Sequence, residues 1–486
     1  MPAVTSNVFA GSQYHGNDKL LLGIVLAVVT FWLFAQTMLN VAPAMRNDLQ
    51  ITEGVTDIAV SITSLFSGIF IVVAGGLADR LGRVKLTNIG LVLSILGSLL
   101  IAVSPAGTMV LLMVGRVIQG MSAACIMPAT LALIKAYFEG KARQRAISFW
   151  SIGSWGGSGL SPLFGGFITS TIGWRWIFWM SIAIAAVSLL LLRGTPDNQA
   201  APTGRKAFDL SGLIAFVIAM VALNVVIGQG TALGWFSPII SVLTIVFFIS
   251  LFVFFKTEIG NINGFVDLTL FHNMTFSGAT LSNFMLNGAA GTLLVVLSLV
   301  QEASGLSSLQ SGLLTVGYLV AVIATIRVGE KLLQSMGSRK PMLLGCWITG
   351  LGILLNTLTF LLLEEYLIIA SVGFTLFGIG LGLYATPSTD AALSNVPEEK
   401  AGSASGIYKM ASSLGAAFGV AISAAIFAGL SHTEGFAGFA DIAMGRTDNV
   451  NLRFAASVAL TFNIFMVAIA ILAIAMMLPR HHSKAE

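Results

Sequence analysis

Charged side chains embedded in long apolar segments are the residues of this sequence best placed to do chemistry. Arg116 and Lys409 lie inside runs that are otherwise uncharged, and Asp390 lies at the end of another. A charge at membrane depth costs about 2.5–3.5 kcal/mol even on lenient scales, so it is retained for a function or for bonds to neighbouring carbonyl groups. Lysine can release its proton, whereas arginine stays charged. We expect these three residues to serve proton transfer or to charge a cavity, with an Asp390–Lys409 ion pair as the structural alternative.

A short segment between two apolar runs, GGLADRLGR at residues 75–83, combines glycines with opposite charges. Glycine permits tight turns and the close approach of helices. Asp79 and Arg83 are four residues apart and can pair, which would latch one conformation and release it in another. The alternative is a solvated turn whose charges only set the orientation of the chain. The residues expected to form a gate are Gly75, Asp79, Arg80, Gly82 and Arg83.

A second unusual segment, GSWGGSGLSPLFGG at residues 153–166, is crowded with glycine inside an apolar run. Glycine costs about 1 kcal/mol in a helix interior, so this density requires a compensating gain. Close packing against another helix and a bend at proline supply that gain. The expected helix-packing residues are Gly157, Pro162, Gly165 and Gly166.

Aromatic and amide side chains within the apolar runs are candidates to line a binding cavity. Aromatic faces attract flat amphipathic molecules, and cations in particular, through stacking and cation–π interactions. Each aromatic residue taken singly could equally pack in the core or face lipid. The candidates are Trp32, Gln36, Asn40, Gln119, Trp150, Trp155, Asn283 and Asn287.

The composition requires a lipid environment for the segments that hold these residues. Of 486 residues, 56% are hydrophobic and only 9% are charged, against about 25% charged in soluble domains. The run 20–39 is too long for the core of a cleavable signal and suits a first spanning helix. Further runs bring the expected total to about fourteen spans. Both cysteines lie in apolar runs and no Cys/His cluster occurs, so we expect neither a metal nor a cofactor.

Charge distribution and an internal echo predict the arrangement of these spans. Most lysines and arginines fall on the side that carries both termini, which the positive-inside rule places in the cytoplasm. Residues 75–86 are echoed by GEKLLQSMGSRK at 329–340, as expected of transporter halves built from repeats. The predicted fold is an all-α polytopic membrane protein of two six-helix halves plus an inserted pair. The expected parts are a first half (1–193), a linker (194–209), the inserted helices (210–255) and a second half (256–486).

Several motifs together resemble the major facilitator superfamily over nearly the whole chain. The segment 75–83 is similar to the family's signature gating loop, and Arg116, Gln119 and Gly120 are similar to its fourth-helix motif. There, the resemblance implies, the arginine faces the cavity and takes part in proton transfer. The segment 153–166 resembles the motif of exporters, with Ser161 in place of a glycine. Residues 36–43, QTMLNVAP, resemble the first-helix motif of fourteen-span drug:proton antiporters, although Ala35 replaces the family's acidic residue.

This resemblance implies proton-driven export of amphipathic drugs, such as fluoroquinolones, dyes and quaternary ammonium biocides, by a monomer in the bacterial cytoplasmic membrane. No acidic residue lies near the centre of an apolar run, which leaves the proton carrier open. Export or uptake of an endogenous metabolite is a second interpretation, and a non-transporting membrane sensor is a third. The sequence contains no paired carboxylates, nucleophile–base set or phosphate loop in a soluble domain, so we expect neither an enzyme nor a nucleic-acid-binding protein.

Overall fold

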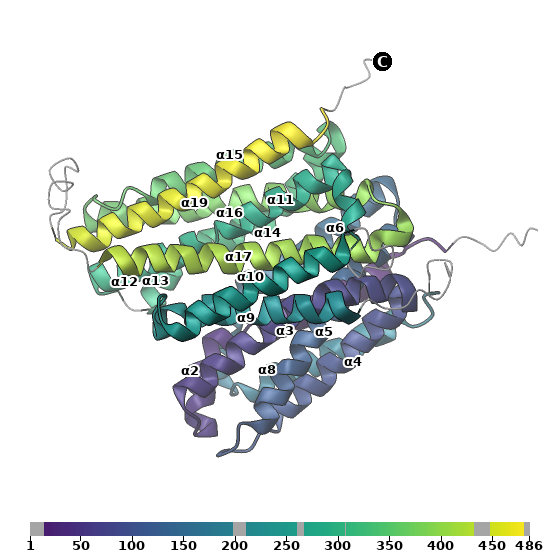
Figure 1. Cartoon of the computed structure of the whole chain (residues 1–486), viewed down its shortest axis with the longest axis horizontal. Coiled ribbons are helices and arrows are strands. Elements are labelled where there is room, and N and C mark those ends of the chain that lie inside the picture. Colours follow the sequence, from purple (N-terminus) through teal and green to yellow (C-terminus); the bar gives the residue numbers. More distant parts are fainter. Residues whose placement is uncertain (1–13, 198–209, 260–266, 307, 432–447, 481–486) are drawn as a thin grey trace, which may run out of the picture.

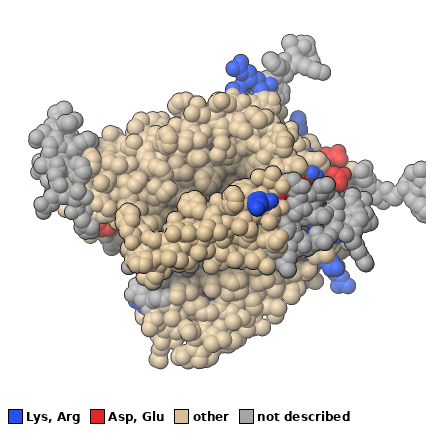
Figure 2. Space-filling model, in the orientation of Figure 1, with Lys and Arg blue, Asp and Glu red and all other residues tan. Residues whose placement is uncertain are grey.

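The computed structural model describes residues 14–197, 210–259, 267–306, 308–431 and 448–480. Throughout these ranges the regular structure is helical, as predicted, and strands are absent from them. Eleven helical segments of the described chain are long and apolar enough to cross a membrane. Figure 1 shows the helices as one elongated bundle, and Figure 2 shows a broad uncharged surface along its side. The chain is therefore built as a multi-pass membrane protein.

The first half of the bundle is made by the segment from Asp18 to Leu192. Two helical segments of this half, residues 18–49 and 140–171, are each interrupted by a π-helical turn. Such turns are wider than an α-helical turn and recur at functional positions. These turns, η1 and η2, pack against each other. The elements are α1 (Asp18–Val29), η1 (Thr30–Ala35), α2 (Met38–Leu49), α3 (Glu53–Leu81), α4 (Arg83–Ala102), α5 (Val110–Tyr137), α6 (Gly140–Ser151), η2 (Ile152–Gly156), α7 (Gly157–Thr171) and α8 (Arg175–Leu192).

Two helices follow that pack along each other, α9 (Leu210–Leu233) and α10 (Pro238–Glu258). Pro238 occupies the first turn of α10, where its missing N–H costs nothing, and the Ser237 hydroxyl caps that turn by accepting the N–H of Ile240. Helix α9 packs against both α3 and α17 (Ala401–Ser431), and Figure 1 shows the pair between these two helices. The pair therefore lies where the two parts of the bundle meet.

The second half contains long helices, and its first helical segment is divided into α11 (Met274–Gly288) and α12 (Gly291–Ser304). Gly337, with φ +76°, separates α14 from α15, just as Gly82, with φ +108°, separates α3 from α4. The echoed segments thus form equivalent glycine turns. The remaining elements are η3 (Leu268–His272), α11 (Met274–Gly288), α12 (Gly291–Ser304), α13 (Ser308–Leu313), α14 (Val316–Met336), α15 (Arg339–Asn356), α16 (Leu363–Ser394), η4 (Glu398–Lys400) and α19 (Val450–Met477).

Candidate functional site

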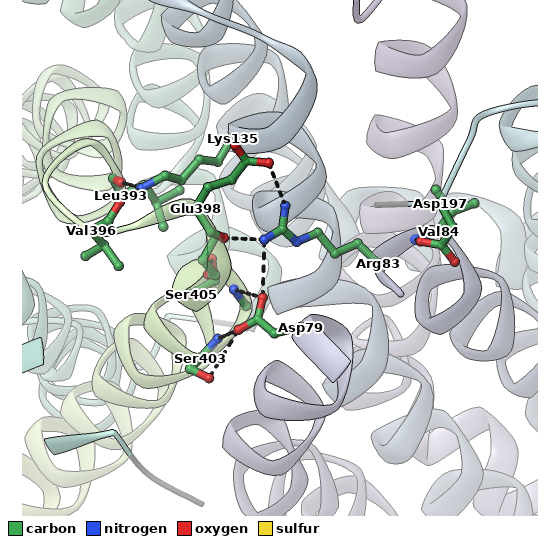
Figure 3. A network of polar contacts seen from close by, with 12 residues as sticks. Asp79, Arg83, Val84, Lys135, Asp197, Leu393, Val396, Glu398, Ser403 and Ser405 are labelled. Atoms are coloured by element: carbon green, nitrogen blue, oxygen red, sulfur yellow. Dashed lines mark hydrogen bonds and ion pairs between the residues drawn. The ribbon is translucent and has the colours of Figure 1, made fainter. Parts of the chain in front are cut away.

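Asp79 links the two halves at one end of the bundle, which we call the gate end. It lies in the last turn of α3 and is buried. Its carboxylate accepts hydrogen bonds from the backbone N–H of Gly402 (2.8 Å) and Ser403 (2.9 Å) and from the Ser403 hydroxyl (3.2 Å). These donors are the first turn of α17, where unpaired N–H groups and the helix dipole favour an anion. Figure 3 shows this carboxylate of the first half capping a helix of the second.

Contact between glycine backbones brings α3 and α17 close enough for this cap. A Cβ atom on Gly75 would lie 2.5 Å from the carbonyl oxygen of Gly402, and one on Gly406 would lie 2.9 Å from that of Ile71. Both distances are too short for any side chain. Gly75 is therefore required for helix approach, with the turn itself made by Gly82.

Arg83 extends the contact between the halves on the other side of Asp79. Its buried guanidinium lies 3.4 Å from the Asp79 carboxylate and 3.6 Å from that of Glu398, and it donates to the Glu398 carbonyl oxygen. Arg80, by contrast, is exposed at the rim. Removal of Asp79 would thus leave a buried cation with weaker compensation, which is costly in a medium of low polarity.

Asp197 supports this gate loop from the segment that follows α8. A side chain on Gly82 would collide with its carboxylate, whose Cγ atom lies 2.5 Å from an ideal Cβ position. The two carboxylate oxygens accept the N–H groups of Val84 (3.1 Å) and Lys85 (3.0 Å) at the start of α4. The loop is therefore held by a carboxylate on each side, Asp79 toward α17 and Asp197 toward α4.

Two further basic residues, Lys135 and Arg143, also join the halves; in the sequence they counted only among the charges that set the orientation of the chain. Lys135, near the end of α5, donates to the carbonyl oxygens of Leu393 and Val396, where α16 ends (Figure 3). A cation at a helix C-terminus is favourable for the same reason as an anion at an N-terminus. The gate end therefore carries matched charges on both helix termini that flank the α16–α17 connection.

Arg143 of α6 is the second of these basic residues, and it corrects one expectation. Its Nε atom lies 3.3 Å from the Asp390 carboxylate, and its Nη2 atom donates to the Ser394 hydroxyl at 2.8 Å. The structural alternative offered for these residues, an ion pair between Asp390 and Lys409, is therefore wrong. No feature of spacing marked Arg143, because its partner is distant in sequence and on the other half.

Lys409 instead lies against an aromatic ring of the first half. It is buried on α17, and its Nζ atom lies 4.2 Å from the centre of the Trp150 ring. Trp150 is fully buried, and its indole N–H donates to the Thr130 hydroxyl at 3.0 Å. Next to it on α6, the Phe149 ring has the Arg327 guanidinium of α14 at 4.8 Å. Two neighbouring rings of one half are thus each covered by a cation of the other, and Phe149 also has Arg145 of its own helix at 5.5 Å.

Arg116 is enclosed within the first half. It is 1% exposed and donates to the carbonyl oxygens of Ala59 (2.8 Å) and Ala35 (2.9 Å) and to the Gln119 side chain (2.8 Å). Gln119 in turn donates to the Ser98 hydroxyl at 3.2 Å. In this conformation both residues join neighbouring helices by hydrogen bonds. A position facing a cavity had been expected of both, and neither lines an open cavity here.

The remaining cavity candidates fall into two separate groups. In the first half, Trp32, Gln36 and Trp155 are half-buried, while the side chain of Asn40 lies outside the described part. In the second half, the Asn283 amide donates to the Tyr408 carbonyl oxygen (3.0 Å), and the Asn287 amide donates to Asn283 Oδ1 (2.9 Å). Ser412 bridges these two amides.

The glycines of α7 differ sharply in their surroundings. A Cβ on Gly165 would collide with Thr37 and lie 3.1 Å from Val41, and one on Gly157 would lie 3.2 Å from Trp32. A Cβ on Gly166 would meet nothing within 4 Å, so the expectation of close packing is wrong there. Pro162 lies within α7, but its side chain is outside the described residues. The glycines that pack closely thus lie on one side of α7, which faces η1 and the start of α2.

A bundle of apolar helices whose two halves are joined by charged contacts at one end is a polytopic membrane protein. A sequence model described as Major Facilitator Superfamily matches residues 20–420 and 277–486, and the chain belongs to that family. It is therefore a secondary transporter and not an enzyme. The quinolone resistance protein NorB of Staphylococcus aureus is 52% identical over 419 residues, in strain MRSA252 and in strain Newman, with 86% of this chain and 90% of the relative covered.

Two solved structures share the fold at low sequence identity. The proton:xylose symporter XylE, bound to 6-bromo-6-deoxy-D-glucose, superposes with a TM-score of 0.65 at 15% identity, over 95% of this chain and 96% of that one. The human organic anion transporter MFSD10 (TETRAN) superposes with a TM-score of 0.57 at 14% identity, over 93% and 98%. Both likenesses support the fold alone.

Proposed function

We propose that this protein exports amphipathic drugs, among them fluoroquinolones, dyes and quaternary ammonium biocides, in exchange for protons. The quinolone resistance named for its relatives and the match over most of both chains support this substrate class. The observation that carries the mechanism is the binding of Asp79 to the first turn of α17. This contact joins the two halves at the gate end, and it consists of hydrogen bonds that can break when the halves move apart.

In this proposal the gate end faces the cytoplasm and the conformation is closed on that side. The chain forms fourteen spans with both termini cytoplasmic and works as a monomer in the bacterial cytoplasmic membrane. Residues 1–193 and 256–486 are the moving halves, 194–209 is their linker, and 210–255 is the inserted pair. Alternating access then follows from rocking of the halves, with proton entry driving drug release outward.

The roles of the charged residues follow from their positions. Gly75, Asp79, Gly82 and Arg83 form the gate, with Arg80 at its rim, and Lys135, Arg143 and Asp390 reinforce it. Arg116 supplies a fixed charge that ties the first half together. Lys409, which can exchange a proton, lies between the halves. The remaining aromatic and amide candidates contact drug as the halves separate in this proposal. They are Trp32, Gln36, Trp155, Asn283 and Asn287.

Efflux of ethidium and norfloxacin from cells tests this function. Cells expressing the protein should export both compounds faster than cells with an empty vector, and collapsing the pH gradient should abolish the difference. An Asp79→Asn protein at equal level provides the inactive control. Equal efflux with and without the protein would favour a metabolite transporter or a sensor, and gradient-independent efflux would remove proton coupling from the proposal.

A further inference from the structure

Two adjacent aromatic rings of α6, Phe149 and Trp150, are covered by cations that belong to the opposite half. Lys409 Nζ lies 4.2 Å from the Trp150 ring centre, and Arg327 Cζ lies 4.8 Å from that of Phe149. Both distances are within the range of a cation–π attraction. The rings and the cations therefore meet only while the two halves are closed against each other.

One ring and one cation, Trp150 and Arg327, are anchored in their own halves. The Trp150 indole donates to Thr130 of α5, at 3.0 Å, which fixes the ring plane within the first half. The Arg327 guanidinium pairs with Glu330 on its own helix, α14. A motion that separates the halves at the gate end would therefore carry the cations away and leave the rings in place.

We propose that Trp150 forms the entry site for a lipophilic cation, and that Lys409 displaces this cation when the gate end closes. The inference rests on the proposed function and deepens it. In the open state the Trp150 face loses its covering cation and becomes available to a quaternary ammonium, phosphonium or phenanthridinium group, whereas Phe149 loses Arg327 but keeps Arg145 of its own helix at 5.5 Å. Closure returns the Lys409 ammonium group to the same Trp150 face, so bound drug and closed gate exclude each other.

Competition for one ring face explains why a buried lysine serves here in place of an acid. Lys409 is buried, and its partner is an aromatic ring. A carboxylate at the same place would attract a cationic drug and retain it. An ammonium group repels the drug and takes over its contact, which promotes release.

The test measures equilibrium binding of tetraphenylphosphonium to purified protein, together with ethidium efflux by cells. Lys409→Met removes the competitor and should tighten tetraphenylphosphonium binding about 5- to 30-fold, the range expected for one desolvated cation–π contact. Efflux should nevertheless slow, because release is no longer driven. Lys409→Arg keeps a competing cation and should bind as the wild type does. The matched control is Lys331→Met, a change of an exposed lysine on α14.

A double-substitution cycle separates competition from simple charge repulsion. Trp150→Leu should weaken binding, and Trp150→Tyr, which keeps a ring, should weaken it less. In a Trp150→Leu background, Lys409→Met should give no further tightening. Tightening that persists without the ring would overturn the shared-face proposal, as would unchanged binding in Lys409→Met. If the wild type neither binds tetraphenylphosphonium nor exports ethidium, the proposed export of cationic drugs itself fails.

Discussion

Asp79→Asn tests the gate most sharply, because the substitution keeps the size of the side chain while it removes the charge. The asparagine retains one carbonyl oxygen and can accept one of the two backbone hydrogen bonds from α17. It loses a charge-assisted hydrogen bond and the interaction of an anion with a helix N-terminus. Together these contribute about 2–3 kcal/mol, so we expect the closed state to lose roughly 30- to 150-fold in population relative to the open state.

Distances across the gate end report this shift directly. Lys141 on α6 and Glu399 on η4 are exposed residues of opposite halves and accept spin labels as Lys141→Cys and Glu399→Cys, in a protein with Cys125 and Cys346 replaced by alanine. Electron–electron double resonance should give a short distance that Asp79→Asn converts to a longer one.

The matched control is Asp18→Asn. Asp18 makes an exposed ion pair with Arg145 at 3.0 Å within the first half, and such pairs contribute little. This variant should keep the wild-type distance and efflux. A wild-type distance in Asp79→Asn, at equal protein level, would refute the account of the gate, whatever happens to efflux.

Three further predictions follow from the packing. Gly165→Leu should abolish efflux, whereas Gly166→Leu, one residue away and facing open space, should leave it nearly intact in the same cell assay; equal loss in both would contradict the one-sided packing of α7. Arg116→Lys should lower the melting temperature in detergent, by an amount equivalent to about 2–4 kcal/mol, because an ammonium group cannot reach the same carbonyl oxygens; an unchanged melting temperature would contradict its structural role. Lys135→Gln should lengthen the spin-label distance less than Asp79→Asn does, because it removes the cation at the end of α16 and leaves the Asp79 cap of α17 in place. An unchanged distance would contradict a role for Lys135 in holding the halves together.

The sequence predicted the all-helical membrane fold of this protein, because lipid demands long apolar helices, and the count of fourteen spans stays a prediction. It also predicted that Asp79 and Arg83 pair and that glycine makes the turn between two helices, because both follow from residue type and spacing. The partner of Asp79 in the second half was not predictable, because it consists of backbone N–H groups at the start of α17, which carry no signal in residue type. The same holds for Arg116, whose burial was foreseen and whose carbonyl partners were not.

Contacts between the halves account for the other differences. Lys135 and Arg143 were interpreted only as orientation charges, because a basic residue at a helix end serves that purpose whether or not it touches the opposite half. The partner of Asp390 depends on which helices face each other, and the expectation that Asp390 and Lys409 lie at the same membrane face could not distinguish Lys409 from Arg143. Gly165 and Gly166 look alike in sequence, and only the rotation of α7 distinguishes them.

Drug movement in proteoliposomes driven by an imposed pH gradient tests the central claim most directly. With purified protein as the only transporter, norfloxacin or ethidium should accumulate in vesicles whose lumen is more acidic than the outside, as protons leave in exchange. The protein-dependent accumulation should disappear when an ionophore collapses the gradient, and Asp79→Asn should reduce it strongly. Accumulation that is the same with and without a pH gradient, or absent in both, would contradict proton-coupled export.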